Sequence, residues 1–316
     1  MSILLEEIQK AGIIAIGGHV RPDGDCIGSC MGLYSYIKEN FPDKRVQVFL
    51  EEIPDAFEYL NRKEALEGST EKFDLFVSLD CGSPDRLGEA EQVFHAAARR
   101  VNIDHHISNT NFADVNHVVV EASSTCEVLC SLLDVEKIGS FSAQAFYTGI
   151  IHDTGVFKHS NTGLSTMEMA GKLMQKGIPF GKIIDESFYL KTYRQLQIMG
   201  RCLLESVRVM DGKVIFSVVS RRVLDFYEAK PSDLDGVIDE LRTTQGVEVA
   251  ILLTEKDTME YKVSMRSNDF VDVSRIASFF GGGGHIHAAG CSIKGSAFDV
   301  INNITEHIEK QFNDQM

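Results

Sequence analysis

The chain has 316 residues, of which 44% are hydrophobic and 24% charged, an ordinary globular composition with enough length for two domains. Its formal charge of −15 and the absence of a basic run argue against a long nucleic-acid groove, so any nucleic-acid substrate is expected to be short. No apolar run reaches the roughly 18–20 residues that span a bilayer, the N-terminus is unlike a signal peptide, and the seven cysteines form no CxxC pair, so we expect a cytoplasmic protein without a membrane segment.

Short apolar runs alternate with helical patterns through the first half, which is typical of βαβ units. The predicted strands are 13–18, 46–50, 73–80 and 101–106. The predicted helices are 27–38, 58–66, 89–100, 123–136, 143–155 and 166–177. This order indicates an α/β domain over 1–185 that is built on a doubly wound, largely parallel sheet.

The pattern changes near residue 186. Apolar residues repeat every three or four positions over 186–207, which predicts a helical connector. The predicted strands that follow are 207–210, 213–220, 247–255 and 261–267, with helices at 233–244 and 271–280. The second domain, 208–316, is therefore expected to be a smaller α/β unit.

Carboxylates and imidazoles gather where predicted strands or helices end. The positions are His19, Asp23 and Asp25, then Asp80, then Asp104-His105-His106, and finally His152-Asp153. In open parallel sheets, ligands bind at the carboxyl edge of the strands, so loops from four separated segments are expected to meet at one point.

The residue types suit divalent metals. Aspartate and histidine together favour Mn²⁺, Fe²⁺ or Zn²⁺, and two ions about 3.5–4 Å apart can share a carboxylate and hold a water that attacks phosphorus. Each position taken alone also fits a turn, a helix cap or a surface histidine. The four together, in this order, favour a metal site.

Four of these segments resemble the motifs of the DHH phosphoesterase superfamily. They are HVRPDGDCIGS, LDCGSPDRLG, NIDHHISN and GIIHDTGVF, while YKVSMRSN and FGGGGHIHAAG resemble the DHHA1 domain. The resemblance covers nearly the whole chain in the expected order. The length and architecture are similar to the stand-alone oligoribonucleases and 3′-phosphoadenosine-5′-phosphate (pAp) phosphatases of that family.

The resemblance implies a role for each motif residue. One metal would be held by His19, Asp23 and Asp80. The second would be held by Asp25, Asp80, His105 and Asp153, with Asp80 shared. His106 would face the scissile phosphate, and Asp104 would orient the histidines. His152 has no role in the family, and a structural one is expected.

The second domain is expected to grip the substrate. Four glycines at 281–284 suit either a flexible linker or backbone N–H groups that approach a phosphate, with His285 beside them. Arg266 suits bidentate phosphate binding, although a surface arginine is the alternative. The resemblance favours substrate binding by Arg266, Gly282, Gly283, Gly284 and His285, assisted by Asn268 and Asn109. Helix capping sufficiently explains Ser123, Ser124 and Thr125.

The resulting hypothesis is two-metal hydrolysis of short oligoribonucleotides, dinucleotides and pAp. Mn²⁺ is the first choice of metal, with Mg²⁺, Fe²⁺ or Co²⁺ as alternatives. Two other functions stay open: a dedicated phosphodiesterase for linear or cyclic dinucleotides, and a nucleotide-sensing protein without activity. No membrane partner is expected, and the resemblance leaves a homodimer open.

Overall fold

A computed structural model describes residues 2–66 and 72–314 of the chain. The fold separates into two compact units, Met1–Leu190 and Lys191–Met316. Within the described residues, no helix is both long and apolar enough to cross a membrane.

The N-terminal unit contains an all-parallel sheet of five strands in the order β2-β1-β3-β4-β5. The strands are β1 (Ile13–Gly17), β2 (Arg45–Phe49), β3 (Leu75–Leu79), β4 (Arg99–Asp104) and β5 (Val115–Val118). The α-helices are α1 (Ile3–Lys10), α2 (Gly24–Asn40), α3 (Lys63–Leu66), α4 (Glu91–Ala96), α5 (Thr125–Leu132), α6 (Ser140–Asp153), α7 (Leu164–Met174) and α8 (Phe180–Ile184). Shorter helical turns cover Asp55–Leu60, Pro84–Ala90, Val135–Lys137 and Asp185–Tyr189.

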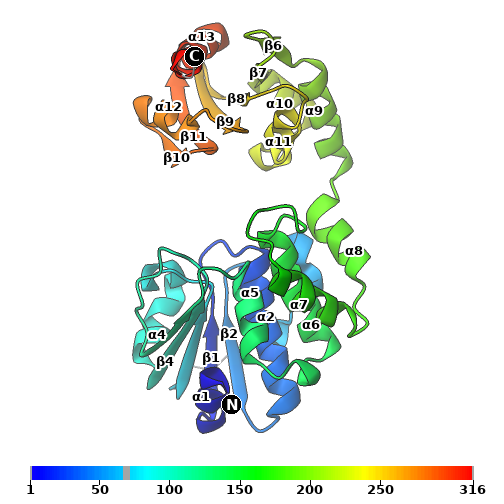
Figure 1. The fold of residues 1–316 in the computed structure, drawn as a ribbon, viewed down its shortest axis with the longest axis vertical. Coiled ribbons are helices and arrows are strands. Elements are labelled where there is room, and N and C mark those ends of the chain that lie inside the picture. Colours follow the sequence, from blue (N-terminus) through cyan, green and yellow to red (C-terminus); the bar gives the residue numbers. More distant parts are fainter. Residues whose placement is uncertain (1, 67–71, 315–316) are drawn as a thin grey trace. The chain divides into compact units, whose positions relative to one another are not determined.

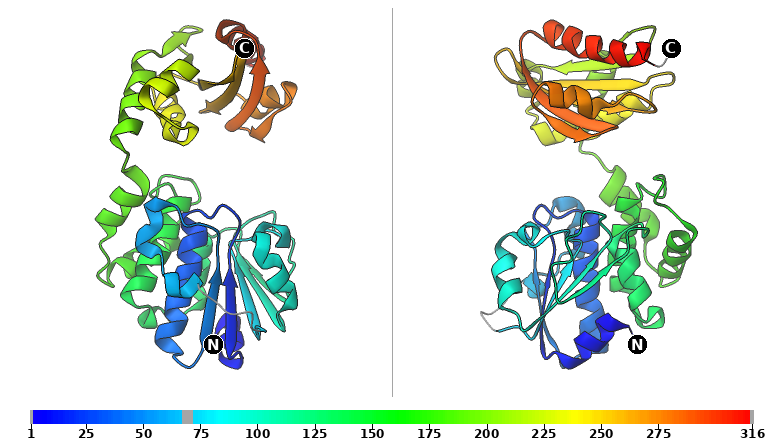
Figure 2. Two further views of the ribbon diagram at one scale, coloured as in Figure 1. Left: turned by 180° about the vertical axis from the view of Figure 1, so that it is seen from behind. Right: turned by 60° about the vertical axis from the view of Figure 1, so that its left-hand side comes forward.

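Helices cover both faces of this sheet (Figures 1 and 2). In β1, Ile14 and Ile16 join the core beneath α2, α5 and α6, whereas Ala15 joins a smaller core beneath α4. In β3, Phe76 likewise faces α4 while Val77 faces the larger core. Burial on both faces explains why these strands are continuous apolar runs. The predicted doubly wound α/β fold is confirmed.

The C-terminal unit is a mixed six-stranded sheet in the order β10-β11-β9-β8-β7-β6. The strands are β6 (Val207–Val209), β7 (Val214–Val219), β8 (Val249–Asp257), β9 (Glu260–Ser267), β10 (Gly283–His285) and β11 (Ala288–Lys294). The helices are α9 (Tyr193–Leu204), α10 (Arg221–Tyr227), α11 (Val237–Arg242), α12 (Val273–Phe279) and α13 (Ala297–Asn313), with a turn at Pro231–Leu234. Among the described strands of this second sheet, only β7 and β8 pair in parallel.

Two predicted helices were wrong in their extent. The helix expected over 89–100 ends at Ala96, because Arg99 and Arg100 pair with β3 as the start of β4. The helix expected over 186–207 is interrupted, because a π-helical turn covers Asp185–Tyr189 and α9 starts anew at Tyr193, where Thr192 caps it and Gln195 closes a capping box. The boundary between units falls just before that cap, and the predicted division at 185 stays a prediction.

Candidate functional site

The predicted ligands lie at the carboxyl ends of β1, β3 and β4. His19 follows β1, Asp80 follows β3, and Asp104 is the last residue of β4. β1 and β3 are neighbours whose following helices cover opposite faces, which is the switch point where open α/β sheets bind ligands. Asp80 has a left-handed φ of 55°, a conformation that a non-glycine residue rarely adopts and that is frequent at functional sites.

Asp80 stands at the centre of the cluster. Its carboxylate lies 3.4 Å from Nε2 of His19 and 3.7 Å from Nε2 of His105. Outside this core, His19 is 3.7 Å from Asp23, and His105 is 3.1 Å from Asp153. The four separated segments therefore meet, and two groups of ligand atoms share the Asp80 carboxylate.

Backbone carbonyls select the nitrogen that each imidazole presents to the cluster. Nδ1 of His19 lies 2.9 Å from the carbonyl oxygen of Val20, and Nδ1 of His105 lies 3.3 Å from that of Ala122. A carbonyl can only accept, so each Nδ1 carries a proton and Nε2 is the nitrogen left to bind a metal. Such outer hydrogen bonds commonly fix metal-ligating histidines.

The N-terminus of α5 holds Asp25, a contact that the sequence did not reveal. The backbone N–H groups of Thr125 and Cys126 donate to the two carboxylate oxygens of Asp25 over 2.7 and 3.0 Å. The hydroxyl of Thr125 donates to Asp80 over 3.0 Å. Thr125 is therefore more than a capping residue, because it contacts two carboxylates, one at the start of α2 and one after β3. Ser124 is the N-cap, as the sequence indicated.

The charges of the cluster fit bound cations. Burial raises the pKa of Asp25, and the carboxylates of Asp80 and Asp153 raise it further. Burial also raises the pKa of Asp153, which its contact with His105 only partly offsets. Buried Nε2 of His105 makes no well-aligned hydrogen bond among the described residues, although Asp153 lies 3.1 Å away. Crowded carboxylates around an imidazole nitrogen are the donor set that a divalent ion would satisfy.

Cys26 lies close to this cluster but does not fit a ligand role. Its sulfur lies within 4.8 Å of ligand atoms of His19 and Asp80. Burial raises the pKa of the Cys26 thiol well above its usual range, and the sulfur accepts the backbone N–H of His19 over 3.2 Å. A protonated thiol is a weak ligand, so Cys26 is a packing residue, as expected for the buried cysteines.

His106 lies beside both Asp104 and Asp80, with its Nδ1 3.6 Å from the Asp80 carboxylate. Its Nδ1 donates to Asp104 over 2.7 Å, and this hydrogen bond raises the pKa of His106. Burial alone would raise the pKa of Asp104, but His106 and Asn109 lower it. With Nδ1 engaged, the half-exposed His106 offers Nε2 to a substrate.

Asn109 holds the carboxylate of Asp104, the hydrogen-bond partner of His106. Its amide nitrogen donates to Asp104 over 2.6 Å and to Asn102 over 2.8 Å, and its oxygen accepts the N–H of Asn111. These contacts position Asp104, and the contact of Asn109 with substrate stays a prediction.

His152 packs away from the cluster, between the rings of Phe57 and Phe188 at 4.8 and 5.4 Å. Its Nε2 lies 3.0 Å from the hydroxyl of Ser187, and burial lowers its pKa to about 4. A Cβ added at Gly24 would lie 2.4 Å from the imidazole, so Gly24 allows α2 to approach this ring. His152 therefore packs the elements behind the site.

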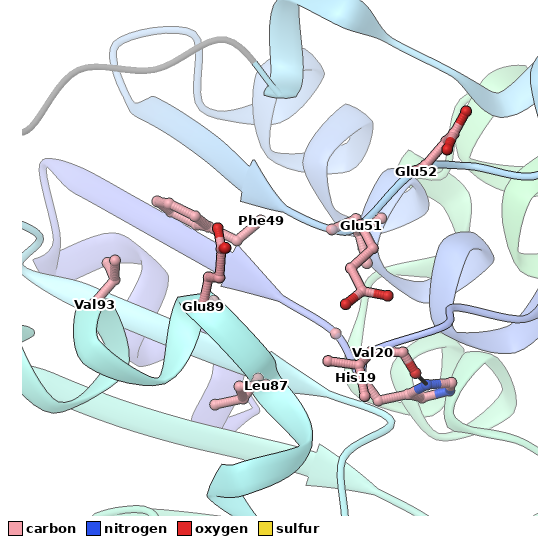
Figure 3. Close-up of a pocket in the computed structure, with 11 residues that line it drawn as sticks. His19, Val20, Phe49, Glu51, Glu52, Leu87, Glu89 and Val93 are labelled. Carbon is pink, nitrogen blue, oxygen red and sulfur yellow. Dashed lines mark hydrogen bonds between the residues drawn. The ribbon is translucent and has the colours of Figure 1, made fainter.

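A cavity of about 460 Å³ lies on the other side of His19, between β2 and the turn before α4. Figure 3 shows the carboxylates of Glu51 and Glu89 pointing into this space, with Phe49 and Leu87 on its walls. Glu52 also lines the cavity. Without a bound cation, this acidic lining disfavours a phosphate.

The four glycines of the C-terminal unit are neither a flexible linker nor an open loop. Gly281 and Gly282 donate their N–H groups to the end of α12, and Gly283, Gly284 and His285 form β10. A Cβ at Gly282 would lie 2.2 Å from the carbonyl oxygen of Gly290, and Gly284 has a φ of 146°. Two glycines are therefore required by packing and backbone conformation. Gly283 has open space around it.

This difference predicts a contrast between two variants. Gly282→Ala should lower the free energy of unfolding by about 1–3 kcal/mol because its methyl group overlaps β11. Gly283→Ala should change it by less than about 0.5 kcal/mol, because nothing lies within 4 Å of the added atom. Urea melts of both variants measure this, and equal stabilities would contradict it. If a substrate phosphate approaches the backbone of Gly283, Gly283→Ala should raise KM even though the stability of the fold is unchanged.

Arg266 and Asn268 lie at and just after the end of β9. Nε of Arg266 is 3.8 Å from Asp239, and its side chain is about one-third exposed. Asn268 is fully engaged: its oxygen accepts from Arg242, and its nitrogen donates to the carbonyls of Arg242 and Val247. Arg266 is therefore available to a ligand, whereas Asn268 contacts protein.

Comparison with known proteins matches each unit to a described domain family. Residues 13–150 match the DHH family, N-terminal domain, and residues 211–314 match the DHHA1 domain. The bifunctional oligoribonuclease and PAP phosphatase NrnA of Thermus thermophilus is 30% identical, covering 94% of this chain and 89% of its own. The Bacillus subtilis protein of that name is 25% identical over 97% and 96%.

Two further relatives differ in architecture or in description. The cyclic-di-AMP phosphodiesterase PdeA of Listeria monocytogenes is 27% identical over 92% of this chain but only 46% of its own length. The crystal structure of an exopolyphosphatase-related protein from Bacteroides fragilis is 25% identical, covers 97% of this chain and 94% of its own, and superposes with a TM-score of 0.83. The domain matches and the full-length relatives agree with the Asp and His cluster at the sheet edge. The chain is a metal-dependent phosphoesterase of the DHH family, with a DHHA1 domain in its C-terminal unit.

Proposed function

We propose that this protein hydrolyses phosphate esters in short oligoribonucleotides and in pAp, using two divalent ions, Mn²⁺ in first place. The observation that carries the proposal is the meeting of His19, Asp23, Asp25, His105 and Asp153 around the shared carboxylate of Asp80. In this proposal His19, Asp23 and Asp80 hold one ion, and Asp25, Asp80, His105 and Asp153 hold the other. When bound, such ions neutralise charge on a phosphate and lower the pKa of a water molecule.

The remaining residues orient and stabilise. The hydrogen bond from Nδ1 of His106 to Asp104 favours the protonated imidazolium, in which Nε2–H can donate to a phosphate oxygen as negative charge builds there. Asn109 holds Asp104 in place, and Thr125 holds Asp80. These contacts keep the cluster preorganised, so little rearrangement is needed during the reaction.

The substrate class is supported by the names of the full-length relatives and by the charge of the chain. With a net charge of −15, the protein has no general attraction for RNA, and local cations such as Arg266 must hold the substrate. Short substrates with a free phosphate suit that arrangement better than long strands do.

A second candidate is a phosphodiesterase specific for dinucleotides. Two cyclic-di-AMP phosphodiesterases, from Listeria monocytogenes and Bacillus subtilis, are each 27% identical over more than nine-tenths of this chain. The chain spans about half of their length, so they carry further segments. Linear pApA or pGpG, or a cyclic dinucleotide, would then be the preferred substrate.

A substrate panel tests these proposals. Purified protein with Mn²⁺ is incubated with a five-nucleotide RNA, pApA, pGpG, cyclic di-AMP or pAp, and products are separated by chromatography. We expect mononucleotides from the RNA and AMP from pAp, with an EDTA-treated sample as the blank. Cleavage confined to dinucleotides would favour the second candidate. No product from any substrate would contradict both and favour a nucleotide-sensing protein.

A further inference from the structure

One face of the C-terminal sheet carries mostly small side chains where β9, β10 and β11 run side by side, and this surface is called the small-residue floor below. Along β9, Val263 and Met265 enter the core with α12 and α13, so Ser264 and Arg266 lie on the opposite face. Strand register places Ala288 beside Arg266 and Gly290 beside Ser264 on this opposite face. His285 and Gly283 of β10 continue the same two rows.

α11 stands beside this floor and supplies a second arginine. Asp239 lies 3.8 Å from Nε of Arg266 and also 3.8 Å from Nε of Arg242, the last residue of α11. The Arg242 and Arg266 side chains are 29% and 33% exposed. The single carboxylate of Asp239 thus lies beside two guanidinium groups. These three side chains together carry a net positive charge at the edge of the small-residue floor.

Asn268 holds Arg242 in a fixed direction. Its Oδ1 accepts from Nη1 of Arg242 over 2.9 Å, while its amide nitrogen donates to the backbone carbonyls of Arg242 and Val247 over 3.1 and 2.8 Å. The loop that follows is fixed as well, because the buried carboxylate of Glu248 accepts the backbone N–H groups of 269–271. The N–H groups of Asn268 are therefore all used within the protein, which leaves none to donate to a phosphate.

The arrangement differs from that of an ordinary surface arginine. A cation at a helix C-terminus is common and usually mobile. Here the Arg242 guanidinium is bound on one side by Asn268 and flanked by Asp239, and its Nη2 has no hydrogen bond to any residue in 2–66 or 72–314. Two guanidinium groups thus lie side by side, and each has N–H donors that no described residue uses. Such a pair can bind the oxygens of a phosphate, because each guanidinium can donate to two of them.

We propose that Arg242 is a second phosphate-binding residue beside Arg266, and that Asn268 is the positioning residue that sets it. The ligand is the phosphate of a nucleotide that is not cleaved, such as the 5′-phosphate of pAp. This inference rests on the proposed function for its choice of nucleotide, but it concerns binding alone.

Binding to the metal-free full-length chain in EDTA tests the inference without turnover. Calorimetry compares pAp with adenosine 3′-monophosphate, which lacks the 5′-phosphate. Arg242→Ala should weaken pAp binding by about tenfold to a hundredfold, as loss of a charge-assisted hydrogen bond does, and should leave adenosine 3′-monophosphate nearly unchanged. Arg275→Ala, an exposed arginine of α12, is the matched control and should stay within about twofold of wild type.

Two more variants separate binding from positioning. Arg242→Lys should recover only part of the affinity, because lysine keeps the charge but not the planar fork. Asn268→Ala should weaken pAp binding, and in the Arg242→Ala background it should have no further effect. Thermal melts confirm that each variant is folded.

Three outcomes would overturn the inference. They are wild-type affinity in folded Arg242→Ala, an equal loss for both nucleotides, or no pAp binding by the wild type. A fully additive Asn268→Ala effect would overturn the positioning role. Failure of the substrate panel alone would overturn the proposed function and leave the result of this binding experiment standing.

Discussion

Asp80→Asn and Asp80→Ala are expected to lower kcat by about a thousandfold or more. Asp80 contacts His19 and His105 and accepts from Thr125, so its carboxylate is the one group common to both halves of the cluster. Asparagine keeps the shape but lacks the charge that two cations require. Phosphate release from pAp at saturating Mn²⁺ measures the effect.

The folded state of these variants is checked separately. Circular dichroism and thermal melting of metal-free protein should show an intact fold, because removing one carboxylate relieves the crowding that raises the pKa of Asp25 and Asp153. A folded Asp80→Asn protein with a rate within about threefold of wild type would show that the two ions do not share this residue.

His106→Ala is expected to lower kcat by roughly 10²–10⁴-fold while metal content stays unchanged. His106 is about half exposed, and its Nδ1 is held by Asp104, so its loss removes a donor aimed at the substrate rather than a metal ligand. Metal analysis of the dialysed protein and initial rates on pAp are measured together. His95→Ala, a histidine on the exposed side of α4, is the matched control and should retain wild-type rates.

The metal content of His106→Ala shows how a loss of its activity is to be interpreted. If His106→Ala lost bound metal in proportion to activity, His106 would be a ligand, and the separation between metal residues and substrate residues would be wrong. A His106→Ala enzyme with a near wild-type kcat would remove it from the reaction altogether.

The sequence was sufficient to predict the layered architecture of the N-terminal unit. Its strands are buried on both faces and appear as unbroken apolar runs, such as LFVSL at 75–79, which are easily recognised. β5 (VNHV) was missed because it is short and half-buried and has two adjacent polar residues at its centre. The helix at 89–100 was overextended because Arg99 and Arg100 suit a helix by propensity, and only pairing with β3 assigns them to a strand.

The candidate metal residues were predictable because their types and their places after strands are both local features. What could not be predicted was the support around them. The grip of α5 on Asp25 joins residues 100 positions apart, and the carbonyls of Val20 and Ala122 that set the imidazole tautomers depend on tertiary geometry. Ser124 and Thr125 give a clear capping signal, but the identity of the carboxylate they meet is not a local property.

The glycine run shows the limit of composition most clearly. Four glycines suit a linker or an anion loop, yet here they continue from a helix end into an edge strand. Gly282 and Gly284 are required by contact with β11, a strand that was itself not predicted. The contact of Asn268 with Arg242 was likewise not predictable, because the two residues are 26 positions apart in the sequence.

The central claim is that this cluster acts with two bound ions per chain. Mn²⁺ is titrated into metal-free wild-type protein at a protein concentration well above the metal dissociation constants, and the rate of AMP release from pAp is followed at each addition. We predict no release without metal and a rate that rises until two equivalents are bound and then stays constant. A rate that saturates at one equivalent, or hydrolysis without any metal, would contradict the two-ion account.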